Sequence, residues 1–170
     1  MLYLHASARD EIIIKPRWPY KQVAVSEEAY SRLQKAQDRL RQHGLRLALT
    51  RGYEYEGVLL KRLHQLARAV SARLFALIYP HRKTECREIF SANGHNVGGD
   101  NVDVAIYHNE KFLTLLPNGV FTPTRTITHI RKLHSSALSL VVDALESNGL
   151  VIHLNKTESM QIHCHVSPAP

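Results

Sequence analysis

Residues 102–116 read Val-Asp-Val-Ala-Ile-Tyr-His-Asn-Glu-Lys-Phe-Leu-Thr-Leu-Leu. Two apolar runs, residues 102–107 and 111–116, flank a short polar segment, and this pattern is typical of a β-hairpin. Before the hairpin, residues 45–50 alternate between apolar and other side chains, as a strand with one buried face does. Two more strands are expected near the end of the chain, at residues 150–154 and 160–166.

Three segments have the apolar spacing of helices. The first begins at Ser26, a capping residue that is followed by two acids, and ends at Gly44. The second covers about residues 58–79 and the third about residues 129–147. Their repeating apolar positions are, in chain order, Ala29, Leu33, Ala36 and Leu40; Leu59, Leu63, Leu66, Val70, Leu74 and Leu77; and Ile130, Leu133, Ala137, Val141 and Leu145. The five positions of the third helix are expected to face inward. We therefore predict an α+β fold with three main helices packed on a small, mostly antiparallel sheet.

The length of 170 residues suits a single domain over residues 1–170. We expect an N-terminal arm over residues 1–25 and a core over residues 26–166. No apolar run approaches the roughly 20 residues needed to span a membrane, so no membrane span is expected. The first residues lack the basic and then apolar pattern of a secretory signal. A cytoplasmic protein is expected, or a periplasmic or cell-wall protein if a signal has been removed.

The net charge of +7 and the 11 histidines narrow the classes of partner. A basic chain attracts polyanions. The Lys and Arg residues are spread along the sequence, however, so nucleic acid is not the expected partner. Neutral imidazole is the commonest metal ligand, and the histidines therefore direct attention to a metal site. The two cysteines, Cys86 and Cys164, are too few for a disulfide framework.

The first candidate motif, residues 94–104, reads Gly-His-Asn-Val-Gly-Gly-Asp-Asn-Val-Asp-Val. His95 follows the first glycine, and Asp103 stands at the head of an apolar strand. The glycines allow a tight backbone turn, so that the two side chains can converge. The same composition also describes an ordinary polar turn before a hairpin, with Asp100 as a turn former.

The second candidate motif, residues 157–166, reads Thr-Glu-Ser-Met-Gln-Ile-His-Cys-His-Val. On a strand, His163 and His165 point to one face because side chains alternate, and Cys164 points to the other. Two imidazoles on one face suit a cation, although a half-exposed strand with histidines on its polar face has the same pattern. Upstream, Glu158 supplies a carboxylate of the kind that acts as general base beside a zinc-bound water.

Together the two motifs contain the donor set of a catalytic zinc site. Such a site has three protein ligands, an open position for water and a carboxylate that moves protons. Ligands of the His and Asp type suit zinc better than the harder cations, which prefer oxygen alone. Zinc is therefore the expected cofactor.

Three stretches resemble the zinc D-alanyl-D-alanine peptidase family, whose fold is shared by the hedgehog signalling domain. Residues 33–53 are similar to the family's first helix, strand and Gly-Tyr turn. Residues 95–104 are similar to its His-x-x-Gly…Asp zinc motif, and residues 145–163 to its last helix and Glu…His element. Ile162-His163-Cys164 is particularly similar to the hedgehog version. The resemblance spans about residues 26–166 and implies a hedgehog-like zinc fold.

The resemblance implies that His95, Asp103 and His163 bind zinc and that Glu158 is the general base. In the family's chemistry the base deprotonates the zinc-bound water, which attacks the scissile carbonyl, and the metal stabilises the resulting oxyanion. The implied partner is a peptide or peptidoglycan-derived substrate.

The spacing of this chain leaves alternatives for two of the ligands. Seven residues separate His95 from Asp103, where the family usually has six, and four separate it from Asp100. Asp103 is preferred because it heads the strand, and Asp100 stays an alternative. Four residues separate the glutamate from His163, where the dipeptidases have two. His165 therefore stays an alternative ligand or a residue that supports the site.

The expected function is a zinc metallopeptidase that hydrolyses short D-amino-acid-containing peptides of peptidoglycan or its precursors. The alternative is a non-catalytic zinc-bearing binding module of the same fold. The alternative is motivated by the residue after the Gly-Tyr turn, which is an arginine in the family and Glu54 here. Arg51 is the expected substitute for that arginine, in the role of stabilising the oxyanion.

Overall fold

The computed structural model describes residues 1–9, 11–18, 20–53, 58–86, 90, 98–113, 119–153 and 161–167. The chain divides into two compact units, one formed by residues 1–54 and 95–170 and the other by residues 55–94. The first unit holds the sheet and every residue of the buried hydrophobic cluster. The expectation of a single domain over residues 1–170 stays a prediction.

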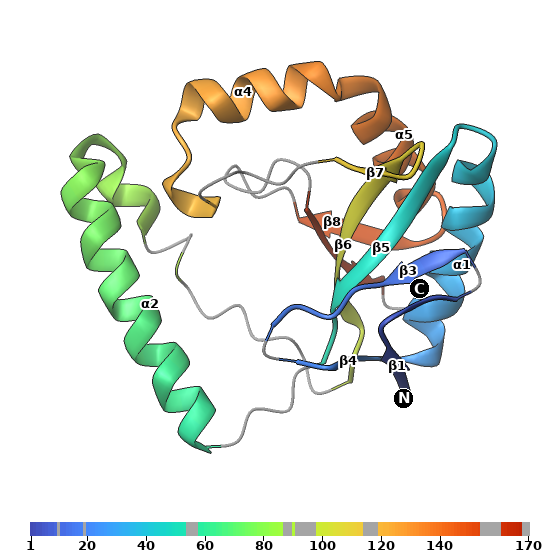
Figure 1. Ribbon diagram of the computed structural model, residues 1–170, viewed down its shortest axis with the longest axis horizontal. Helices are drawn as coiled ribbons and strands as arrows, with labels where there is room; N and C mark the ends of the chain where they lie inside the picture. The colour runs from blue at the N-terminus through green and yellow to red at the C-terminus, as the bar shows by residue number, and fades with distance from the viewer. Residues whose placement is uncertain are drawn as a thin grey trace. The chain divides into compact units, whose positions relative to one another are not determined.

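The first unit is built on a mostly antiparallel sheet (Figure 1). Its strands are β1 (Leu2–His5), β2 (Ser7–Arg9), β3 (Ile12–Ile14), β4 (Gln22–Val25), β5 (Leu45–Arg51), β6 (Asn101–His108), β7 (Lys111–Phe112), β8 (Leu150–His153) and β9 (Ile162–Val166). The main sheet has the order β2-β3-β5-β6-β9-β8, whereas β1 and β4 form a separate ribbon. Strand β3 is parallel to β5, and the other pairs among the described strands are antiparallel. The predicted α+β class and mostly antiparallel sheet are confirmed.

Strands β6 and β7 form the predicted hairpin. Asn109 and Glu110 connect them with φ values of 48° and 64°, which is the backbone of a tight hairpin turn with both central residues left-handed. Strand β7 is shorter than the expected run to residue 116, of which residues 114–116 lie outside the described part of the chain. Strand β6 lies between β5 and β9, so its side chains alternate between the two faces of the main sheet.

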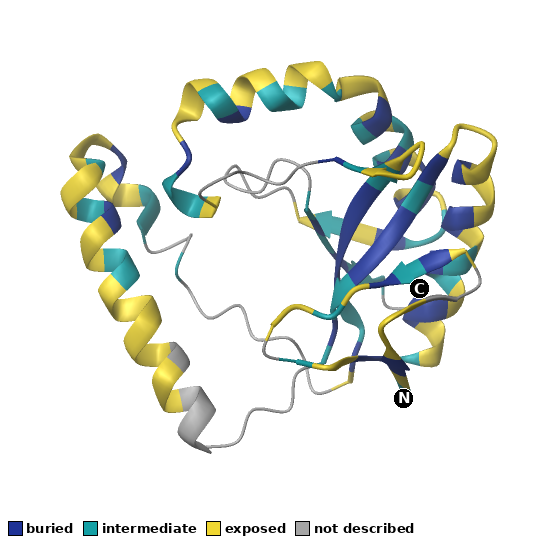
Figure 2. Ribbon diagram, viewed as in Figure 1, coloured by how far each residue is buried: buried dark blue, intermediate teal, exposed yellow. Residues whose placement is uncertain are grey.

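Two helices, α1 (Glu27–Arg41) and α5 (Ser135–Glu146), pack against each other and against the sheet (Figures 1 and 2). Helix α1 contacts β5, and α5 contacts β8. The predicted cap of α1 is confirmed, because the Ser26 side chain accepts a hydrogen bond of 3.1 Å from the N–H of Ala29. The apolar positions that repeat at helical spacing in α1 are all buried: Ala29, Leu33, Ala36 and Leu40.

The helix expected over residues 129–147 is two helices in the structure. After the short helix η2 (Gly119–Phe121), α4 (Thr124–Leu133) begins well before the expected start. Between α4 and α5, His134 has a φ of −111° and a ψ of 21°, which interrupts the helical repeat. Because the repeat is interrupted, Leu133 does not share the buried face of α5. The prediction that Leu133 faces inward is wrong: it is 66% exposed, whereas Ala137, Val141 and Leu145 are buried.

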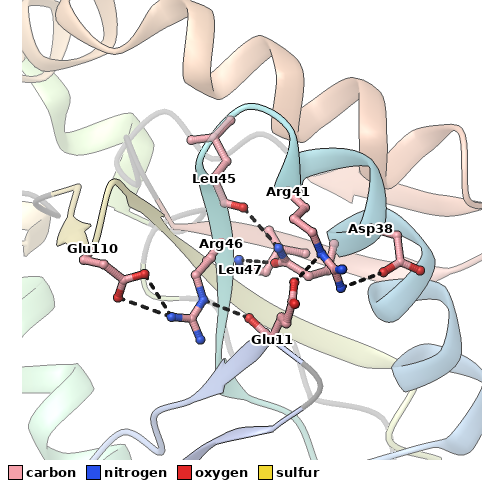
Figure 3. A network of polar contacts seen from close by, with 8 residues as sticks. Glu11, Asp38, Arg41, Leu45, Arg46, Leu47 and Glu110 are labelled. Carbon is pink, nitrogen blue, oxygen red and sulfur yellow. Dashed lines mark hydrogen bonds and ion pairs between the residues drawn. The ribbon is translucent and has the colours of Figure 1, made fainter.

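A buried amide fixes α1 to the sheet. Gln37, which is 1% exposed, donates to the carbonyl of Leu45 and accepts from the N–H of Leu47 on β5. Figure 3 shows the surrounding network, in which the ion pairs are Arg46–Glu110, Arg41–Glu11 and Arg41–Asp38. Exposed ion pairs contribute about 0–1 kcal/mol each, and the buried amide matters more because its loss leaves two backbone groups unpaired.

The second unit contains the predicted helix α2 (Val58–Ile78), followed by the short helix η1 (Pro80–Glu85). Phe75 of α2 is fully buried, and its ring lies 5.3 Å from that of Tyr79 and 5.8 Å from that of Phe90. Within the described residues, no helix combines the length and the apolar character that crossing a membrane requires.

Candidate metal centre

Asp103 and His163 face each other across two neighbouring strands. The register of β6 and β9 pairs these two residues directly. Their neighbours Val104 and Cys164 belong to the buried core, so the alternation of the strands directs Asp103 and His163 to the opposite side of the sheet. The Nδ1 atom of His163 lies 2.6 Å from Oδ1 of Asp103. The structure thus brings together two of the predicted ligands.

The second carboxylate oxygen of Asp103 is also engaged. Gln161 donates from Nε2 to Oδ2 of Asp103 at 2.7 Å, and a guanidinium nitrogen of Arg51 lies 3.8 Å from the same oxygen. Asp103 is only 4% exposed, and a carboxylate buried to this extent needs such partners to stay charged. The carboxylate of Asp103 is therefore held in place by contacts with an imidazole, an amide and a guanidinium.

A bulge in β5 explains why Arg51 reaches Asp103. Leu49 pairs with Val104, but Arg51 pairs with Asp103, so Thr50 is the additional residue on its strand. Without it, Arg51 would continue the alternation of Leu49 and point into the core. The hydroxyl of Thr50 donates to the backbone carbonyl of Asp103 at 3.0 Å. The bulge thus supplies both the arginine and a contact to the strand that carries the carboxylate.

Gly99 lets the chain pass close to Val25 and Ser26 just before β6 begins. Its φ is +74°, and a Cβ at this position would lie 2.9 Å from the backbone nitrogen of Ser26 and 3.1 Å from the carbonyl carbon of Val25. The carbonyl of Gly99 accepts a hydrogen bond of 3.0 Å from the N–H of Ser26. Only glycine combines this backbone conformation with so close an approach. The turn that precedes Asp103 is therefore held against the start of α1.

Two further histidines extend the polar face beside His163. Nε2 of His153 lies 2.7 Å from Nδ1 of His165, and the two rings stack with centroids 4.7 Å apart. The ring of His163 is 5.4 Å from that of His153. Burial, followed by repulsion from His165 and His163, lowers the pKa of His153. A lowered pKa favours the neutral imidazole, which is the form that binds metals.

Cys164 lies between the two histidines of β9 but belongs to the core side of the sheet. It is fully buried, and both Cys164 and Cys86 are free thiols. Burial first, and then the negative charge of Asp103, raises the pKa of Cys164 to about 12. The thiol therefore stays protonated near neutral pH and does not offer the thiolate that metals bind.

The other predicted site residues are placed differently. His95 and Glu158 lie outside the described residues. Asp100 precedes β6, and its carbonyl accepts a hydrogen bond of 3.1 Å from the N–H of Val166. His165 pairs with Asn101 rather than with Asp103.

Gln161 is a site residue that the sequence reasoning missed. It stands two residues before His163, so the alternation of an extended chain directs both side chains to one face. That spacing was the available signal, but it does not reveal which partner the amide meets. The register of β9 against β6 supplies this information, because it fixes the position of Asp103.

The donors that Asp103 and His163 present fit a zinc ion. Zinc prefers imidazole nitrogen and carboxylate oxygen, and this chain places the partly buried imidazole of His163 beside the nearly buried carboxylate of Asp103. Among the residues that the structure describes, no group of three or more His, Cys, Asp or Glu side chains is arranged to hold a metal ion. The third predicted ligand, His95, is not among those residues. No protein-family model matches the chain, and no curated protein matches it either.

Proposed function

We propose that this protein is a zinc metallopeptidase that hydrolyses short D-amino-acid-containing peptides of peptidoglycan or its precursors. The observation that carries the proposal is the contact of 2.6 Å between His163 and the nearly buried carboxylate of Asp103. The class of substrate comes from the resemblance of the ordered motifs to the D-alanyl-D-alanine peptidases.

In this proposal His95, Asp103 and His163 hold the metal. The chemistry that zinc supplies at such a site is activation of a water molecule and polarisation of a carbonyl. Glu158 takes a proton from the attacking water and passes it to the leaving amine, so that one water is added across the peptide bond. Arg51 supplies positive charge on the same face of the sheet, which favours the negative oxygen of the tetrahedral intermediate.

The metal assignment is tested by the zinc content of purified variants. His163→Ala and Asp103→Ala should lose the stoichiometric zinc of the parent protein, because each removes one of three protein ligands. His108→Ala is the matched control, since His108 is an exposed histidine at the far end of β6. Stoichiometric zinc in His163→Ala would show that this residue is not a ligand.

The reaction is tested separately with D-Ala-D-Ala and a set of muropeptides. Glu158→Gln should keep its zinc and lose at least about a hundredfold in kcat, because the general base is removed while the ligands remain. Full activity of Glu158→Gln would exclude the assigned role of Glu158.

The second candidate function is a non-catalytic zinc-bearing binding module. It is favoured by the contact of Arg51 with Asp103, because that contact directs the guanidinium toward a proposed ligand instead of an open substrate position. Stoichiometric zinc without turnover of any peptide in the same screen would support this candidate against the peptidase.

A further inference from the structure

Helix α2 presents an exposed apolar stripe. Residues three and four positions apart lie on the same side of a helix, and five apolar residues of α2 follow this spacing. We call them the leucine stripe: Leu63, Leu66, Val70, Leu74 and Leu77. Each is exposed, from 47% at Leu74 to 78% at Leu77 (Figure 2). A stripe of this kind normally marks a surface that binds something apolar.

The opposite side of α2 makes the contacts of the second unit. Phe75 is buried against Tyr79 and Phe90, and the guanidinium of Arg82 lies 5.1 Å from the centre of the Phe75 ring. The thiol of Cys86 donates to the carbonyl of Ala72 at 3.3 Å. The unit thus packs on the side of Phe75, while the leucine stripe remains exposed.

The charge of α2 has one sign. Its sequence contains Lys61, Arg62, Arg68 and Arg73 but no Asp or Glu. Among the ion pairs that the described residues form, none involves an arginine of this helix. The second unit as a whole has seven Lys and Arg against three Asp and Glu, so it carries much of the net charge of +7.

Two of the arginines border the leucine stripe. Arg62 stands four residues before Leu66, and Arg73 stands four residues before Leu77, so each pair lies side by side on the helix. Arg68 falls on the far side of the helix. Long basic side chains beside an apolar stripe can extend their charged ends to a polar boundary while their stems remain in apolar surroundings.

We propose that α2 binds the surface of an anionic membrane, lying in the plane of the interface with the leucine stripe inserted among the lipids. The apolar stripe, the bordering arginines and the absence of acidic residues are the features of an interfacial helix. At 1.5 Å per residue, the 21 residues of α2 give about 30 Å of contact along the surface.

The charge pattern argues against two other occupants. A second copy of α2 would bring arginines against arginines, with no acid on the helix to pair with them. A nucleic acid would attract the arginines, but its phosphates offer nothing to five apolar side chains. An anionic lipid surface satisfies both the charges and the stripe.

The test is co-sedimentation of the full-length protein with lipid vesicles. Vesicles that contain phosphatidylglycerol should bind the protein, vesicles of phosphatidylcholine alone should bind it much more weakly, and added salt should reduce binding. The double variant Leu66→Gln/Leu77→Gln should bind at least about tenfold more weakly, because two inserted side chains are lost. Arg62→Gln/Arg73→Gln should lose about fivefold per arginine.

Leu133→Gln is the matched control, because Leu133 is also an exposed helical leucine and follows two basic residues, but it lies on α4. Its binding should equal that of the parent protein. All variants should keep the melting temperature and zinc content of the parent, since an exposed stripe supports neither. The proposal is overturned by absence of binding to phosphatidylglycerol vesicles, or by equal binding of the leucine double variant. It is also overturned if that variant dissociates a dimer or melts earlier, because the stripe then packs against protein.

Discussion

At the scale of single residues, the orientation of the Asp103 carboxylate depends on Gln161. The amide of Gln161 donates to the oxygen of Asp103 that His163 does not contact. If Asp103 binds zinc, Gln161→Leu should weaken zinc binding by about 10–100-fold, the usual effect of removing a group that orients a ligand. Titration against a chelator measures this change. Gln42→Leu, at an exposed glutamine of the same chain, should leave the affinity unchanged, and an unchanged affinity in Gln161→Leu would contradict the role.

Alternation along the strands was enough to predict that His163 and His165 share a face and that Cys164 points to the other face, where the structure buries it. It was not enough to choose between Asp100 and Asp103, because that choice depends on the register between two strands distant in sequence. The register pairs Asp103 with His163 and leaves Asp100 before the strand. Residue types and local spacing do not contain this information.

At the scale of elements, the end of β5 depends on a glycine. A Cβ on Gly52 would lie 2.2 Å from the backbone oxygen of Ala24 and 2.8 Å from a methyl group of Val25, both on β4. Gly52→Ala should therefore destabilise the protein by about 1–3 kcal/mol, measured by urea denaturation. Gly98→Ala is the control, since a Cβ there meets only the side chain of Asp100. Equal stability of the two variants would show that β4 leaves room for a Cβ atom at position 52.

The elements that sequence predicted best have a boundary signal of their own. Helix α1 has the predicted Ser26 cap, and the apolar positions that repeat along it are buried. The segment around His134 has neither Gly nor Pro, and the helical spacing runs on through the break, so one helix was predicted where two exist. The bulge at Thr50 also has no signal in the sequence, because a bulge changes the pairing of a strand without changing its composition.

At the scale of the whole molecule, length and the apolar stripe of α2 together favoured one domain with three packed helices. In the structure α2 belongs to the second unit and its leucine stripe is exposed, while the single domain stays a prediction. Amphipathic spacing shows that a helix has an apolar side, but it does not show whether protein or lipid covers that side. The absence of acids in α2 is the sequence feature that distinguishes its polar side from that of α1.

Because every residue of the buried cluster belongs to the first unit, that unit should fold without α2. Replacing residues 58–90 with a flexible Gly/Ser linker of about ten residues should preserve a cooperative urea transition. The same protein should keep the zinc of the parent and lose its binding to anionic vesicles, because the proposed ligands and the leucine stripe belong to different units. Leu47→Ala in the full chain is the reference for a substitution that damages the core, with an expected loss of about 2–5 kcal/mol in the free energy of unfolding. A broad, non-cooperative transition in the shortened protein would show that α2 is part of the core, and retained vesicle binding would place the lipid surface elsewhere.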